Sequence, residues 1–99
     1  MQNHMPKMVE SYHHFTAECF REGALSASEK QLIALGISLI NNNEVCTYYH
    51  VEEALQHGAT QEQVLEAAAV AAALGGGHAM SQGVTRVQEA LHQAGKTVQ

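Results

Sequence analysis

The chain has 99 residues, of which 45% are apolar but only 5% aromatic, so alanine-rich, closely packed helices are favoured over a bulky core. Ten acidic and five basic residues give a net charge of −5, and the basic residues are scattered along the sequence. Because phosphate neutralisation supplies most of the affinity for nucleic acids, this balance argues against a nucleic-acid partner.

Membrane insertion and export are also not expected. The longest apolar run, residues 67–74, is far shorter than the ~18 residues that a membrane span requires. The N-terminus lacks the basic-then-apolar order of a signal peptide. With only Cys19 and Cys46, no disulfide framework is available. We therefore expect one soluble, cytoplasmic domain over residues 1–99, with no membrane partner.

Helical periodicity begins near the N-terminus. Apolar residues recur every three or four positions over residues 8–22, which predicts a first helix with one apolar face, ended by Gly23. The members of that face are Val9, Tyr12, Phe15, Cys19 and Phe20. Ser26 and Glu29 then have the spacing of a capping box, which predicts a second helix over residues 27–40 that is nearly all buried.

Three further helices are predicted. The asparagines at 41–43 separate the second helix from a third over residues 44–57, which closes at Gly58. Thr60 and Gln63 form another capping box before a fourth helix that is apolar all round, and Met80, Val84, Val87 and Leu91 give a last helix one stripe. An all-apolar helix needs more cover than this chain provides, so we expect the fourth or last helix to lie in a subunit interface.

The third helix carries the candidate chemistry. If Asn43 is its N-cap, Cys46 lies in the first turn, where the helix dipole and unpaired amides make a thiolate easier to form. His50 follows one turn later on the same face and is a candidate base or proton donor. Glu53 could orient the His50 imidazole, and His57 lies one turn beyond Glu53. Together with Cys46, these residues form one stripe along the helix.

Plainer interpretations of the same residues stay open. Cys is often buried, and a Cys and a His one turn apart occur by chance in many helices. His50 and His57 lie two turns apart without a second pair at zinc-site spacing, so we expect no metal and no cofactor. Gly75-Gly-Gly77 lacks the pattern of a phosphate loop and predicts a bend. His78, directly after it, could open toward the same pocket as His50.

These landmarks together resemble a known family. They are Leu25-Ser26, Gln31-Leu-Ile-Ala-Leu35, Glu44-x-Cys46-x-x-x-His50, Ala54, Gly58-Ala-Thr60 and Ala72-Ala-Leu-Gly-Gly-Gly77. In order and spacing they resemble the carboxymuconolactone decarboxylase and alkylhydroperoxidase D (AhpD-like) family over about residues 25–90. The resemblance implies an all-α, AhpD-like helical bundle that assembles as a homo-oligomer, either a trimer or a hexamer.

The peroxidase branch of that family implies specific roles. Its members use a Cys-x-x-Cys pair, a histidine four residues later and a glutamate on the preceding helix. Cys46 matches the cysteine that attacks the hydroperoxide, and His50 matches the relay histidine. Asn43 stands in place of the resolving cysteine, Gln31 in place of the glutamate and Val45 in place of a histidine found between the cysteines. A two-cysteine cycle therefore cannot run, and an external thiol reductant would have to close the cycle.

Three hypotheses follow from the sequence. We place first a peroxiredoxin-type thiol peroxidase, with catalytic Cys46 and His50 and with Glu53, Tyr49, Gln31 and Asn43 in support. The second is a lactone decarboxylase in which His50 donates a proton and Arg21 or Arg86 binds a substrate carboxylate. The third is a non-catalytic oligomer that binds a small molecule. The sequence assigns no position to Cys19 relative to Cys46.

Overall fold

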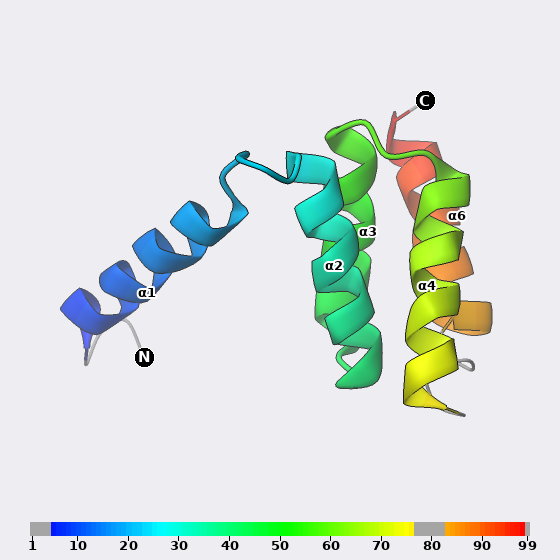
Figure 1. The fold of residues 1–99 in the computed structure, drawn as a ribbon, viewed down its shortest axis with the longest axis horizontal. Coiled ribbons are helices and arrows are strands. Elements are labelled where there is room, and N and C mark those ends of the chain that lie inside the picture. Colours follow the sequence, from blue (N-terminus) through cyan, green and yellow to red (C-terminus); the bar gives the residue numbers. More distant parts are fainter. Residues whose placement is uncertain (1–4, 77–82, 99) are drawn as a thin grey trace.

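Within residues 5–76 and 83–98, which this computed structural model describes, the only regular elements are helices. They are α1 (Pro6–Phe20), α2 (Ala27–Ile40), α3 (Glu44–Gln56), α4 (Gln61–Gly75), a π-helical turn η1 (Gly83–Val87) and α6 (Gln88–Val98). Figure 1 shows α2 and α4 in front of α3 and α6, while α1 extends away from this bundle. The all-α fold class is therefore confirmed. No helix in the described ranges is long and apolar enough to cross a membrane.

The predicted helix boundaries rest on caps that the structure contains. Ser26 Oγ accepts a hydrogen bond from the Glu29 amide at 3.1 Å, and Glu29 Oε1 accepts from the Ser26 amide at 2.7 Å. Thr60 and Gln63 repeat this reciprocal arrangement before α4. Both capping boxes satisfy amides that have no partner within the helix, and both are confirmed.

The turn between α2 and α3 is built by its asparagines. Asn42 has a φ of 56°, in the left-handed region that Asn tolerates better than most residues. Asn43 is the N-cap of α3, as expected. At the other end of α3, Gly58 has a φ of 105°, a conformation that strains any residue with a Cβ atom. The helix therefore ends there.

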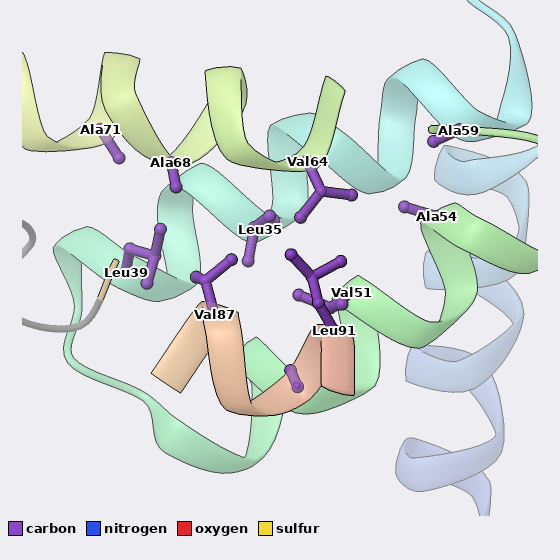
Figure 2. Packing of buried hydrophobic residues seen from close by; sticks show 11 residues of the cluster. Leu35, Leu39, Val51, Ala54, Ala59, Val64, Ala68, Ala71, Val87 and Leu91 are labelled. Atoms are coloured by element: carbon purple, nitrogen blue, oxygen red, sulfur yellow. The ribbon is translucent and has the colours of Figure 1, made fainter. Parts of the chain in front are cut away.

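The core lies among α2, α3, α4 and the last helical segment (Figure 2). Its largest fully buried apolar residues are Leu35, Leu39, Val51, Val64 and Val87. Alanines such as Ala68 and Ala71 fill the space beside them, which lets the helices approach closely. The stripe predicted for the last helix is confirmed at Val87 and Leu91, whereas Met80 and the Val84 side chain lie outside the described part of the chain.

One expectation about burial was wrong, and the bounds of the first helix differ from those predicted. The second helix is not nearly all buried, because Ile33 and Ile37 lie on a side of α2 that the chain leaves exposed. The first helix begins at Pro6, a residue suited to the first helical position, and it ends at Phe20 rather than near Gly23. None of its residues is buried, so its apolar face is not part of the core of this chain.

Candidate functional site

The candidate site is organised around His50, whose imidazole is held from the neighbouring helix. His50 Nδ1, on α3, lies 2.7 Å from Gln31 Oε1, on α2. The Gln31 side chain is buried, with the residue only 7% exposed. An amide oxygen only accepts hydrogen bonds, so this pairing assigns the proton to Nδ1 in the neutral ring. Nε2 then carries the lone pair and can accept a proton.

Two aromatic rings enclose the imidazole. Phe20, the last residue of α1, stacks on it with ring centroids 5.8 Å apart and an interplanar angle of 13°. The Tyr49 ring contacts it edge-on at 5.1 Å and 73°. Burial among these groups lowers the pKa of His50 below its ordinary value, and the negative charge of Glu53 opposes that shift. The imidazole is therefore neutral at pH 7 and able to act as a base.

Cys46 lies in the first turn of α3, where the sequence places it. Its backbone N–H donates to Asn43 Oδ1 at 3.0 Å, so Asn43 caps the helix directly beneath the thiol. The thiol is half-buried, and it shares a helix face with His50 one turn later. Among the described residues, no hydrogen bond joins the Cys46 sulfur to the imidazole.

The other members of the predicted stripe have different positions. Glu53 does not orient the imidazole as expected, because Nδ1 is already bonded to Gln31, and Glu53 acts on it through charge. His57 is exposed at the end of α3, where its Nδ1 lies 2.8 Å from the Glu53 carbonyl oxygen. His78 lies outside the described residues. In those that are described, no group of three or more His, Cys, Asp or Glu could hold a metal ion.

Phe20 is the site residue that sequence reasoning missed. The helical period of α1 identifies it only as one member of an apolar face. Its stacking on His50 depends on how α1 meets α2, where Lys30 Nζ donates to the carbonyl oxygens of Cys19 at 2.9 Å and Arg21 at 2.5 Å. No local pattern in the sequence signals that contact. Cys19 itself is exposed on α1.

The two arginines considered for a substrate carboxylate are both paired with protein groups. Arg21 is largely exposed and forms an ion pair with Glu18. Arg86 Nη1 donates to Asn42 Oδ1 at 2.8 Å, and its Nε lies 3.7 Å from Glu44 Oε2. Glu44 and Cys46 are two positions apart on α3, so their side chains point about 200° apart around the helix axis. The side of α3 that carries Glu44 is therefore remote from the face that carries Cys46.

Comparison with known sequences gives one family and several relatives. Residues 6–94 match the carboxymuconolactone decarboxylase family. An uncharacterised protein of Cupriavidus necator is 31% identical over 72 residues, and uncharacterised protein 4 in the cox locus of Paracoccus denitrificans is 42% identical over 60 residues. These matches cover 73% and 61% of this chain but only 64% and 54% of the respective relatives.

Solved structures share the fold at lower sequence identity. A carboxymuconolactone decarboxylase family protein of Legionella pneumophila superimposes with a TM-score of 0.87 at 24% identity, covering 94% of this chain and 82% of that one. A protein of the same family from Thermotoga maritima, described with a possible involvement in an antioxidative response, gives 0.83 at 23% identity, covering 91% and 76%. At such identities these likenesses establish the helical fold and nothing more.

Proposed function

We propose that this chain, which belongs to the carboxymuconolactone decarboxylase family, is a one-cysteine thiol peroxidase that reduces hydroperoxides. Cys46 is the nucleophile, His50 is the base, and an external thiol is the reductant. The hydrogen bond between Gln31 and His50 is the observation that carries this proposal. It leaves Nε2 unprotonated in a neutral ring, one helical turn beyond a thiol in the first turn of α3.

The chemical steps balance with these groups and one class of co-reactant. The Cys46 thiol gives its proton to His50 Nε2, and the resulting thiolate attacks the terminal oxygen of a hydroperoxide. The O–O bond breaks, and the alkoxide that leaves takes the proton back from the imidazolium. This produces an alcohol and a sulfenic acid on Cys46. One external thiol condenses with the sulfenic acid and releases water, and a second thiol reduces the mixed disulfide.

The surroundings of each group support its role. Cys46 lies in the first turn of α3, and Asn43 caps the helix beneath it without adding a charge of its own. The stacked ring of Phe20 and the edge of Tyr49 keep the imidazole partly out of water. A partly desolvated base stays neutral at pH 7, which is the form that can remove a proton from the thiol.

Lactone decarboxylation is the weaker hypothesis for this chain. A carboxylated substrate requires a cation beside the proton donor. Arg21 is instead paired with Glu18 in solvent, and Arg86 is engaged with Asn42 and Glu44 on another side of α3. The peroxidase needs no cation at the substrate, because a hydroperoxide is neutral.

The test is hydroperoxide consumption in the presence of a small dithiol. We expect Cys46→Ser to abolish turnover and His50→Gln to lower it by roughly 10²-fold or more, as loss of a positioned base does. Cys19→Ser is the matched control and should retain full activity. Turnover that survives Cys46→Ser would overturn the proposal. Turnover of a carboxylated lactone that needs His50 but not Cys46 would favour the decarboxylase, and binding without consumption would favour a binding protein.

A further inference from the structure

Lys30 lies where its own helix disfavours a cation. It belongs to the first turn of α2, behind the N-cap Ser26, and the amides of a helix N-terminus carry partial positive charge. Its ammonium group instead binds the end of α1, where Nζ donates to the carbonyl oxygen of Cys19 at 2.9 Å and to that of Arg21 at 2.5 Å. The last carbonyl groups of a helix carry partial negative charge and lack partners within the helix. The charge of Lys30 therefore stabilises the end of α1 rather than its own helix.

The end of α1 has neither a cation nor a glycine cap of its own. Its last turn contains no basic residue, and its C-cap, Arg21, has an extended backbone conformation rather than the left-handed one of a glycine cap. The Arg21 side chain forms an ion pair with Glu18 in solvent. Lys30 thus supplies from α2 the cation that the last turn of α1 lacks.

The two carbonyl groups that Lys30 binds lie on either side of Phe20. Cys19 precedes Phe20 and Arg21 follows it, so one ammonium group fixes the backbone before and after this residue. The Phe20 side chain is half-buried, and its ring stacks on the His50 imidazole. The remainder of α1 extends away from the bundle (Figure 1). The clamp on the backbone of Phe20 therefore lies at the end of α1 that meets the site.

Consecutive residues of α2 thereby act on the imidazole from two directions. Gln31 Oε1 lies 2.7 Å from His50 Nδ1, at the edge of the ring. Lys30, one position earlier, holds the residue whose ring covers a face of the same imidazole. The glutamine sets the tautomer, whereas the covered face is withheld from water.

We propose that Lys30 is a positioning residue of this site: its ammonium group binds the carbonyl oxygens on either side of Phe20 and so keeps the Phe20 ring over the His50 imidazole. The lysine acts through Phe20 and takes no part in the chemistry. That this cover matters for peroxide turnover rests on the proposed function, in which His50 is the base. That it controls the protonation of His50 does not.

The expected consequence is a change in the pKa of His50. The groups that surround the imidazole come from three helices. They are Phe20 of α1, Gln31 of α2, and Cys46, Tyr49 and Glu53 of α3. Burial lowers the pKa of the imidazole, and the negative charge of Glu53 opposes that shift. Loss of the Phe20 cover should therefore raise the pKa of His50 toward the ~6.5 of an exposed histidine.

A pH titration of the His50 ring protons, followed by NMR, tests this without turnover. Lys30→Met should raise the midpoint and move the resonances away from their stacked positions, whereas Lys30→Arg retains a charged donor and should preserve both. Lys7→Met is the matched control, because Lys7 is exposed near the other end of α1, and it should change neither. Lys30 and Phe20 lie outside the apolar core, so the bundle should stay folded in these variants. An unchanged titration in Lys30→Met would overturn the proposal.

A double-mutant cycle separates positioning from a direct effect of the lysine charge. Removal of a cation can by itself raise the pKa of a nearby imidazole. Phe20→Ala should also raise the midpoint, and Lys30→Met should then add nothing in the Phe20→Ala background. Phe15→Ala removes an exposed ring from the same helix and should have no effect. An equal shift from Lys30→Met with and without Phe20 would overturn the proposal, because the lysine would then act through charge alone.

The pH–rate profile connects this role to the proposed function. If His50 is the base, Lys30→Met should move the acid limb of peroxide turnover to higher pH by the same amount as the NMR midpoint, and Lys30→Arg should resemble the wild type. Absence of turnover in the wild type would overturn the peroxidase but not the role of Lys30, which the NMR titration decides. An acid limb that stays in place while the midpoint moves would likewise remove His50 as the base and leave the positioning of Phe20 supported.

Discussion

His50 is oriented by Gln31, nineteen residues earlier in the chain, through a 2.7 Å contact between Nδ1 and Oε1. An amide in this position fixes the tautomer of the ring without adding charge. A carboxylate there would also raise the pKa of the imidazole, because it stabilises the charged form. With the neutral Gln31 side chain in place, burial lowers the pKa of His50, and the negative charge of Glu53 opposes this shift.

The first prediction concerns this hydrogen bond. Gln31→Leu preserves side-chain bulk but leaves the Nδ1–H group buried without a partner, which should cost about 1–3 kcal/mol of stability. It should also slow peroxide turnover about tenfold or more, since the ring can adopt the unproductive tautomer. Gln31→Glu should retain turnover and move the acid limb of the pH–rate profile to higher pH. A Gln31→Leu enzyme with the wild-type rate would remove Gln31 from the mechanism.

The second prediction concerns stability as a function of pH. The pKa of His50 is lowered in the folded chain by burial, so between the folded value and the unfolded value of about 6.5 the unfolded chain binds more protons. The stabilising contribution of the neutral ring is therefore complete above about pH 6.5 and decreases as the pH falls toward the folded value. Measured by thermal unfolding, the His50→Gln variant should therefore lose less stability than the wild type as the pH falls through this range.

The control for this titration is His14→Gln. His14 is exposed on α1 and makes no hydrogen bond among the described residues. Its replacement should leave the pH dependence of unfolding as it is in the wild type. If His50→Gln and the wild type lose the same stability between neutral and mildly acid pH, then His50 is not partly buried as the structure indicates.

The sequence predicted the helix ends far better than the contacts between helices. Ser26, Asn43 and Thr60 act through neighbouring amides, so their caps are encoded within four residues and were correctly identified. Periodicity shows that Phe15 and Ile37 lie on apolar faces but not that both side chains stay exposed in this chain. The Gln31–His50 and Phe20–His50 contacts join different helices, and only the family resemblance drew attention to Gln31.

The third prediction separates the two roles of Asn43. Asn43→Ala removes the Oδ1 acceptor of the Cys46 amide and should destabilise the chain by about 1 kcal/mol, measured by urea unfolding. Asn43→Asp retains the cap and should unfold like the wild type. Its carboxylate would nevertheless lie beside the first turn and disfavour a thiolate at Cys46. Alkylation by iodoacetamide in a Cys19→Ser background should therefore be slower in Asn43→Asp, and equal rates would show that a charge at position 43 does not act on the Cys46 thiolate.

The fourth prediction concerns the product of oxidation. In the wild type no second cysteine lies at the start of α3, so excess peroxide without an external thiol should carry Cys46 beyond the sulfenic acid to the sulfinic acid. Asn43→Cys places a thiol at the N-cap, from which the native side chain already reaches the Cys46 amide. Such a neighbour should capture the sulfenic acid within the same molecule and release water.

Mass spectrometry of the intact chain distinguishes these products. In a Cys19→Ser background, peroxide should add two oxygen atoms to the chain with Asn43 and should remove two hydrogen atoms from Asn43→Cys. The second product should disappear on treatment with a dithiol, whereas a sulfinic acid should persist. If Asn43→Cys gains oxygen to the same extent as its parent, the N-cap side chain and the Cys46 sulfur do not approach closely enough to bond. The sulfenic acid would then be open only to thiols from solution.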